Sequence, residues 1–524
     1  MNRKILVLLC IFILSRLFFA NSSPVFFDSP EYLNRFLNPN FFQTITSGHS
    51  PFHLSYIMLF WSIFQTANFL RINAPFAIIF MQILFSAITV YCFYRFVEII
   101  TNAKIAIIAV IICALTPLYW ITNVSIMVES TYINFFFISI FLISLSITKN
   151  AHSKFYLFAG CIFFGLAILT NPLVILWIPF ILSVVYFLKK RKMYLILLLI
   201  ILSAIFAFLI NSFFIASAFH MSLLKGINQY LFGVDIKLTP NISSFITALR
   251  FIRNTLFSIL IVNTSIIFIL SIASLITMFK RKMKLFIISL LWTFPIIITS
   301  QWYDSLLFAR HGTIAGFGFA LLVAIFLEKR KILYFMVIGY LLLVSLPTLA
   351  LLKQPIPYLQ MRKFVKTLPK GLLIETHFAR PQIEGYYSGK TIFINQPGWN
   401  KQGLEKTIDI YLQNKKPIFI TSQALSDPYG IYSGPFLNPL SLSYSKKLEL
   451  EDILPLYSTI KYSTIDEDAG LLVYEIISKE KSKFPNIPNL TYSNHQIGYF
   501  DPANQLLLFI ESAKIIQSHN IIKE

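Results

Sequence analysis

Long apolar runs follow one another along this chain as far as residue 352, and they limit the folds open to it. A helix that crosses a bilayer needs about 17–25 predominantly apolar residues. Runs of about this length lie at 4–20, 75–94, 105–121, 128–147, 155–170, 172–188, 193–217, 254–279, 285–300, 312–327 and 332–352. Charged residues make up only 13% of the chain, whereas soluble domains carry roughly 25%. The sequence therefore predicts a polytopic α-helical membrane protein.

A further apolar run, at about 51–70, differs from the others because polar residues interrupt it. These are His53, Ser55, Ser62, Gln65 and Asn68. Polar groups at bilayer depth are costly, so we expect this run to lie at the interface or to re-enter the bilayer rather than to cross it. The other runs then amount to about eleven predicted spans.

Three basic clusters predict how the spans are oriented. They are Lys189–Lys192, Lys280–Lys282 and Lys329–Lys331, and two predicted spans separate each cluster from the next. All three therefore lie on one side, which should be the cytoplasm because short cytoplasmic loops are rich in Lys and Arg. The N-terminus falls on the same side if 51–70 does not cross. This arrangement places the N-terminus inside and the C-terminal part outside the cell membrane.

The first apolar run also has an alternative interpretation, a cleaved signal peptide. A basic start and a short apolar stretch fit a signal peptide. However, cleavage before Asn21 would need small residues in an A-x-A-like pattern. The bulky Phe18 stands at the first of these positions, followed by Phe19 and Ala20. An uncleaved first span is the better prediction.

The composition changes at residue 353 and divides the chain into two predicted domains. Residues 1–352 hold 25 Lys and Arg but seven Asp and Glu, whereas residues 353–524 hold 19 and 16. The second part reads as strands at 371–375, 391–394, 417–421 and 471–476, with helices at 401–414 and 504–518. Strand–helix–strand order predicts an α/β domain with a partly parallel sheet, here extracytoplasmic.

The few acids of the first domain are the informative charges. Glu98 and Glu328 fall in predicted cytoplasmic loops, where ordinary loop charges are expected. The other five fall on the predicted outer side: Asp28, Glu31, Glu129, Asp235 and Asp304. Asp28 could cap a short helix that begins at Ser29 or Pro30. It could instead act as a base at the membrane surface.

Several short motifs resemble the GT-C class of membrane glycosyltransferases over about 1–352. They are Asp28-x-x-x-Tyr32, Gly48-His49-x-Pro51, Thr116-Pro117 followed by Glu129, Gly165-Leu166-Ala167-x-x-Thr170-Asn171-Pro172, and Phe308-Ala309-Arg310-His311. The protein O-mannosyltransferases and aminoarabinose transferases are the most similar groups. The chain departs from their patterns at Glu129 (commonly Asp), Asn171 (commonly Lys) and His311 (commonly Tyr), and Glu31 is not adjacent to Asp28. These departures leave the sugar open.

The resemblance implies a reaction and a set of site residues. A single sugar would pass, with inversion, from a polyprenyl-phosphate donor to a hydroxyl of a glycan, lipid or protein acceptor. Asp28 would take the acceptor proton, a step typically worth about 10²–10⁴-fold, and Glu129 would face it. The expected substrate-binding residues are Glu31, Tyr32, Arg35, His49, His53, Arg310 and His311, with Arg35 and Arg310 directed at the leaving phosphate.

The other expectations concern ligands and rival functions. We expect no cofactor and no nucleic-acid partner, and the charge balance serves mainly to orient the helices. His49 and His53 with the two acids could hold a divalent metal, but this is not favoured. A transporter or lipid flippase is the first rival, although such proteins place ionisable groups inside their spans and often show repeats. A ligase that moves a lipid-linked oligosaccharide would need similar acids and arginines.

Overall fold

The computed structural model describes the chain in two compact units. The larger takes in Met1–Pro24 and Tyr32–Ala350, and the smaller Val25–Glu31 and Leu351–Gly498. The described residues are 3–20, 28–46, 53–149, 152–189, 193–232, 245–300, 310–351, 357–376, 383–394, 400–426, 450, 453–466 and 471–481.

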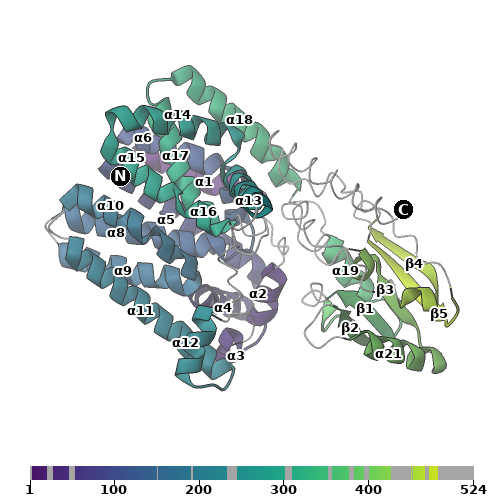
Figure 1. Cartoon of the computed structure of the whole chain (residues 1–524). Helices are drawn as coiled ribbons and strands as arrows, with labels where there is room; N and C mark the ends of the chain where they lie inside the picture. The colour runs from purple at the N-terminus through teal and green to yellow at the C-terminus, as the bar shows by residue number, and fades with distance from the viewer. Residues whose placement is uncertain are drawn as a thin grey trace. The chain divides into compact units, whose positions relative to one another are not determined.

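The larger unit is entirely helical in its described parts (Figure 1). Its helices are α1 (Arg3–Phe19), α3 (Phe41–Thr46), α4 (Leu54–Phe69), α5 (Ala74–Ile100), α6 (Ala103–Leu115), α7 (Pro117–Val124), α8 (Glu129–Thr148), α9 (Ser153–Thr170), η1 (Pro172–Trp177), α10 (Ile178–Lys189), α11 (Met193–Ala218), α12 (Leu223–Phe232), α13 (Phe245–Asn263), α14 (Ser265–Arg281), α15 (Met283–Thr293), α16 (Pro295–Thr299), α17 (Thr313–Leu327) and α18 (Lys331–Leu351). Helix α2 (Asp28–Phe36) begins in the smaller unit and ends in the larger one.

These helices confirm a multi-pass membrane protein. In the described part of the chain, five helices are long and apolar enough to cross a bilayer: α5, α8, α9, α11 and the helix of residues 310–327. The pair α6–α7, bent by 67°, makes a sixth if it is one broken span. Shorter apolar helices cover Pro172–Leu188, Met283–Thr299 and Lys331–Pro347. The total of about eleven spans stays a prediction.

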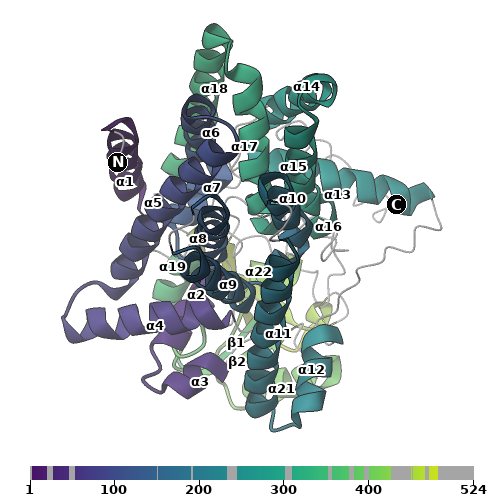
Figure 2. The same cartoon turned by 90° about the vertical axis from the view of Figure 1, so that its left-hand side faces the viewer.

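The expected single span at 254–279 is wrong in its detail, because the chain breaks there into α13 and α14. Thr264 lies between them with φ 94° and ψ 157°. A β-branched residue rarely adopts such a conformation, which costs about 1–3 kcal/mol. The apolar stretch therefore continues through the break, but the helix does not. Figure 2 shows α13 running crosswise to α15.

The run at 51–70 forms α4, whose direction differs from that of the long helices. In Figure 2, α4 lies across the direction of α11. Gln65 of α4 donates from Nε2 to the carbonyl oxygen of Phe36, the last residue of α2, at 2.6 Å. This is consistent with the expected interfacial segment, which itself stays a prediction.

One hydrogen bond identifies the end of the bundle where two loops meet. Asn102, between α5 and α6, donates to Glu328 Oε1 at 3.1 Å, and Glu328 follows α17. Two basic residues lie at this end: Lys104 is the second residue of α6, and Lys329 lies in the loop between α17 and α18. Arg310 precedes the other end of α17, whose 15 residues extend over roughly 22 Å. The loops with basic residues and Arg310 therefore lie at opposite ends of this helix.

Aromatic side chains fill the centre of the bundle. Trp292 stacks on Phe180 with a centroid distance of 4.4 Å, and Phe317 lies 4.2 Å from Phe137. The indole nitrogen of Trp292 donates to the carbonyl of Ile314 at 3.0 Å. This bond satisfies the indole N–H, which would be costly to bury alone, and it fixes the start of α17 against α15.

The smaller unit contains a five-stranded sheet in the order β2-β1-β3-β5-β4. Its strands are β1 (Leu372–Thr376), β2 (Lys390–Ile394), β3 (Ile418–Thr421), β4 (Ser458–Asp466) and β5 (Leu471–Ser478); its other described elements are α19 (Pro357–Val365), α21 (Lys401–Gln413), α22 (Ser422–Ser426) and η7 (Leu454–Leu456). β1 pairs in parallel with β2 and β3, and β5 runs antiparallel to β3 and β4. This confirms the predicted α/β domain with a partly parallel sheet.

The predicted elements of this unit agree with the structure except at one strand. Strands β1, β2, β3 and β5 and helix α21 form where the sequence predicts them. The sequence does not predict β4. Its residues Ile460 and Tyr462 are exposed, and Lys461 stands between them, so the run lacks the continuous apolar character of the other strands. The helix expected at 504–518 lies outside the described residues.

A polar contact joins α21 to the sheet. Asp409 accepts from Tyr457 at 2.8 Å and from Lys479 at 2.5 Å. Burial alone would raise the pKa of Asp409, but the hydrogen bonds from Lys479 and Tyr457 lower it below its ordinary value. The carboxylate therefore stays ionised at neutral pH, and the contact is present there.

The close approach of α8 and α9 at Gly160 generates a stability prediction. A Cβ atom on Gly160 would lie 2.9 Å from Ile143 Cγ1 and 3.2 Å from the carbonyl oxygen of Ser139. We expect Gly160→Ala to destabilise the protein by about 1–3 kcal/mol, as overpacking does. The measurement is thermal unfolding of the detergent-solubilised chain.

Gly339 of α18 is the matched control for this prediction. A Cβ there would meet nothing within 4 Å. Gly339→Ala should therefore leave stability unchanged or raise it by up to about 1 kcal/mol through helix propensity. Equal effects of the two substitutions would contradict the close approach of α8 and α9.

Candidate functional site

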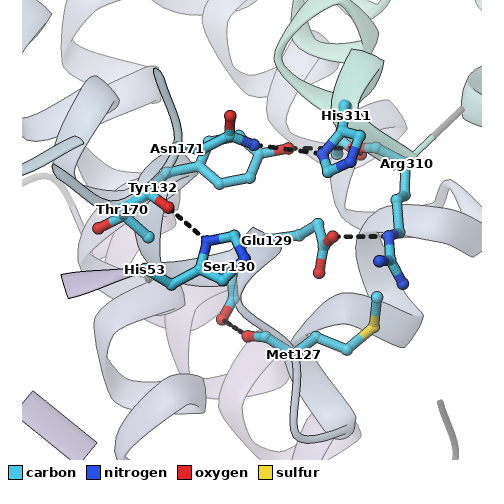
Figure 3. A network of polar contacts seen from close by, with 10 residues as sticks. His53, Met127, Glu129, Ser130, Tyr132, Thr170, Asn171, Arg310 and His311 are labelled. Atoms are coloured by element: carbon cyan, nitrogen blue, oxygen red, sulfur yellow. Dashed lines mark hydrogen bonds and ion pairs between the residues drawn. The ribbon is translucent and has the colours of Figure 1, made fainter. Parts of the chain in front are cut away.

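A buried ion pair lies at the end of the bundle opposite the basic loops. Arg310 Nε is 2.8 Å from Glu129 Oε1. Glu129 is 1% exposed and Arg310 9%. Glu129 is the first residue of α8, and Arg310 stands three residues before α17. Figure 3 shows the carboxylate facing the Nε side of the guanidinium group.

Neighbouring side chains hold Glu129 in place. Gln82, inside α5, donates from Nε2 to the carbonyl of Met127 at 2.7 Å and to Ser130 Oγ at 2.8 Å. These two acceptors flank Glu129 in the sequence, so one amide fixes the turn that begins α8. The helix N-terminus also favours a carboxylate electrostatically.

Two hydroxyl groups hold Arg310 by its main chain. Tyr132 donates to the Arg310 carbonyl at 3.3 Å, and Thr313 Oγ1 donates to the same oxygen at 2.5 Å. Tyr132 lies three residues after Glu129 and so on the same face of α8. One helix face therefore contacts both the side chain and the main chain of Arg310.

His311 faces an amide, and the contact specifies its tautomer. Asn171 Nδ2 lies 3.2 Å from His311 Nδ1, while Asn171 Oδ1 accepts from the N–H of Leu173 at 3.0 Å. Because Asn171 Oδ1 accepts the bond from Leu173, the NH₂ end of the amide is the one that faces His311. An amide NH₂ only donates, so Nδ1 accepts and the ring is neutral with its proton on Nε2. In this tautomer the ring N–H of His311 is the one on Nε2.

His53 joins Glu129, Arg310, His311 and Asn171 in one polar cluster (Figure 3). Its Nδ1 lies 2.7 Å from the carbonyl oxygen of Thr170. A carbonyl only accepts, so Nδ1 carries the proton. His53 is 7% exposed and has φ 49°, a left-handed conformation, immediately before α4. The end of α9 is thus linked to the start of α4.

The remaining predicted site residues are placed differently. Tyr32 is buried and packs edge-on against His53 and Tyr56, at centroid distances of 6.0 and 4.9 Å. Arg35 donates from Nε to the carbonyl of Thr44 at 3.1 Å and from Nη2 to that of Ile45 at 3.1 Å. Arg35 therefore joins α2 to α3.

Three predicted residues are only partly described or not described at all. Asp28 is the first residue of α2, and its side chain lies outside the described part of the chain. Glu31 lies in the same helix, half-buried. His49 lies outside the described residues. Among the described residues, no group of three His, Cys, Asp or Glu side chains is arranged to hold a metal ion.

Sequence reasoning missed several members of this site. Gln82 has a signal that could have found it, since it is the single amide in an apolar run. Tyr132 could have been found from its i+3 spacing to Glu129. Asn171 was identified as a departure from a family pattern but not as a site residue. Asn171 and His311 both depart from the family pattern, and in the structure these two residues contact each other.

An apolar groove begins next to the cluster. It holds about 870 Å³ and is lined from α4, α5, α8, α9 and α11. Leu54 and Ser55, which follow His53, belong to its lining, as do Leu166 and Leu169 near the end of α9. The groove thus joins an apolar surface to the polar residues at the end of the bundle.

The buried pair generates a prediction on stability. Glu129→Gln leaves the Arg310 charge without its carboxylate, so we expect a loss of about 3–5 kcal/mol. The double variant Glu129→Gln with Arg310→Gln should recover part of this loss, because no unpaired charge is left. Unfolding of the purified chain in detergent measures both.

The ion pair Arg95–Glu98 is the matched control, since its side chains are 36% and 27% exposed. Glu98→Gln should cost about 1 kcal/mol or less. If Glu129→Gln costs no more than Glu98→Gln, then the pair at the cluster is not a buried one.

Comparisons with known proteins show that the fold of this chain is a known one. Residues 49–211 match the model of the dolichyl-phosphate-mannose-protein mannosyltransferase family. No curated protein matches the chain by sequence. ArnT from Cupriavidus metallidurans, solved with undecaprenyl phosphate, is similar at a TM-score of 0.53 and 11% identity, over 92% of this chain and 99% of that one.

Oligosaccharyltransferase structures from Archaeoglobus fulgidus are also similar. One complex with zinc and sulfate has a TM-score of 0.51 and 12% identity, over 83% of this chain and 70% of that one. Another, of AglB with an inhibitory peptide and a dolichol-phosphate, has a TM-score of 0.50 and 11% identity, over 95% and 77%. The family match over residues 49–211 and the shared fold both agree with the resemblance to GT-C membrane glycosyltransferases that the motifs predict.

Proposed function

We propose that this chain transfers a single sugar from a polyprenyl-phosphate donor to an acceptor hydroxyl, at the end of the bundle where Glu129 and Arg310 meet. The observation that carries the proposal is that an apolar groove begins at Leu54, directly after His53, in the polar cluster that also holds this buried ion pair. A lipid phosphate has the same two parts, an anionic head and an apolar chain. ArnT and AglB are similar in fold, and their structures were solved with undecaprenyl phosphate and a dolichol-phosphate.

Arg310 is the residue we assign to the leaving phosphate. Glu129 holds the guanidinium at Nε, which orients the Nη edge of the fork. A planar guanidinium suits phosphate oxygens, and a cation placed before the reaction stabilises the charge that develops on the leaving group. In this proposal Glu129 orients Arg310, rather than facing the base as the motifs alone imply.

Asp28 is the residue we assign to the acceptor. A hydroxyl is a poor nucleophile, so a positioned carboxylate has to take its proton as it attacks the anomeric carbon. The attack breaks the bond to the phosphate oxygen, which leaves with the electron pair, and the anomeric centre inverts. Asp28 opens α2 in the segment whose Asp-x-x-x-Tyr pattern resembles the family motif.

The cluster also contains two neutral groups, the Asn171 amide and the His311 ring. Asn171 contacts the His311 ring at Nδ1 and fixes how the ring is oriented. Such groups are suited to sugar hydroxyls, which form hydrogen bonds without needing a charge. We assign His311 to the sugar and leave the acceptor as a glycan, lipid or protein hydroxyl.

The first prediction from this proposal concerns transfer itself. With radiolabelled hexose or pentose on undecaprenyl phosphate and native membranes as the acceptor source, the parent chain should transfer label. Asp28→Asn should lower turnover by roughly 10²- to 10⁴-fold, the usual worth of a general base. Scintillation counting of the labelled product measures both.

Glu98→Gln is the control for this assay, because Glu98 lies at the opposite end of the bundle. It should retain the parent's turnover. Equal turnover of the parent and Asp28→Asn would reject Asp28 as the base. A parent that transfers none of the sugars offered would reject the proposed function.

A second prediction concerns the side on which the reaction occurs. The basic loops indicate a cytoplasmic end, so we propose that the ion pair and the C-terminal domain face the outside of the cell membrane. Alkaline phosphatase, which is active only outside, should be active when fused after Leu352 and inactive when fused after Lys190. Activity at Lys190 instead would reverse the arrangement.

A further inference from the structure

Arg16 is a buried cation that the proposed reaction does not use. It lies in α1 and is 2% exposed. The rings of Phe12 and Trp120 lie 4.0 and 4.2 Å from its guanidinium carbon. Among the described residues no carboxylate pairs with it. An ionised group at membrane depth without a counter-ion is costly and marks a function by default.

The Arg16 guanidinium donates a hydrogen bond at the junction of two helices that meet at an angle. Its Nη2 donates to the carbonyl oxygen of Ala114, near the end of α6. α6 and α7 are bent by 67° at this point. Pro117 begins α7 and has no N–H, so the usual helical donor to the carbonyl of Cys113 is missing. The last carbonyls of α6 therefore need other partners.

Every one of these carbonyls has a donor, and two of the donors come from distant helices. Thr116 Oγ1 donates to Cys113 at 2.7 Å. Arg16 donates to Ala114 from α1, and Ser345 donates to Leu115 from α18 at 2.6 Å. In hydrocarbon an unpaired carbonyl costs several kcal/mol. Arg16 thus satisfies a group that would otherwise disfavour the bend.

The bend leads directly to the ion pair. α7 ends at Val124, and Glu129 follows after four residues, Ser125–Val128. These residues are buried, and Gln82 holds the carbonyl of Met127 among them. The direction of α7 therefore sets where α8 begins, and with it the carboxylate that contacts Arg310.

We infer that Arg16 is a positioning residue: by bonding Ala114 it fixes the α6–α7 bend and so places Glu129 against Arg310. This rests on the proposed function for its effect on turnover. The alternative role, binding an anion, suits the geometry less well. One edge of the fork is used by Ala114 and Ser15, and two aromatic rings cover the group.

The test compares Arg16→Met, which keeps the length but removes the donors, with Arg16→Lys, which can still donate to Ala114. Arg16→Met should lower kcat by roughly 10- to 100-fold, as a misplacement near 1 Å does. The KM for undecaprenyl-phosphate sugar should change by less than about twofold, since ground-state binding is kept. Arg16→Lys should recover part of kcat.

Hydrogen–deuterium exchange supplies a readout that does not depend on turnover. Amides of residues 116–128 should exchange faster in Arg16→Met, while those of α9 should not change. Arg330→Met is the matched control, because Arg330 also lies over a ring, Phe326 at 3.8 Å, and donates to a main-chain carbonyl, but on the exposed side. It should alter neither exchange nor kinetics.

The possible outcomes separate the alternatives. A higher KM with unchanged kcat and exchange would make Arg16 an anion ligand and overturn the inference. Faster exchange with unchanged kcat per folded molecule would reduce Arg16 to a stabilising residue and also overturn it. A parent without transfer would reject the proposed function, while the exchange data would still decide whether Arg16 holds the bend.

Discussion

The structure of the helical unit depends on one constraint, that a main-chain carbonyl in hydrocarbon has no water to bond. Each place where a helix breaks must therefore supply a donor. Arg16 and Ser345 do so at the end of α6, and His53 does so at the end of α9. Thr313 and Tyr132 do so at Arg310, before α17. Polar side chains that make the breaks possible thus gather at one end of the bundle.

These breaks account for the position of the polar cluster. Glu129 begins a helix, Asn171 follows one, and Arg310 precedes one. Side chains at helix ends can meet across a bundle without crossing its apolar centre, which aromatic rings fill here. The ion pair is then buried by protein at the end of the bundle where the proposed reaction would take place. A buried pair contributes little net stability, so orientation of Arg310 is the stronger reason for Glu129.

The sequence predicted the apolar helices and the sheet because both depend on composition over many residues. The class of enzyme was recognised from short motifs, and Glu129 and Arg310 were both among the candidates. What the sequence could not show was which group each of them contacts. Arg35 and Arg310 look alike in the sequence, but Arg35 bonds main-chain carbonyls and Arg310 bonds a carboxylate. The break at Thr264 has no Pro or Gly to mark it, so the apolar run reads as one span.

The charges of the cluster are relevant to the kind of sugar donor that the proposed reaction would use. Where the similar families have Lys, this chain has Asn171, and the residue beside it in space is a neutral His311. Within the described part of the cluster the positive charge rests on Arg310, and Glu129 offsets it. A lipid diphosphate carries more negative charge than a monophosphate and would call for more cations close by. In the proposed function, one oriented guanidinium in the described part of the cluster fits a donor in which a single phosphate joins the sugar to the lipid. In that proposal, catalysis depends on the placement of Arg310 by Glu129.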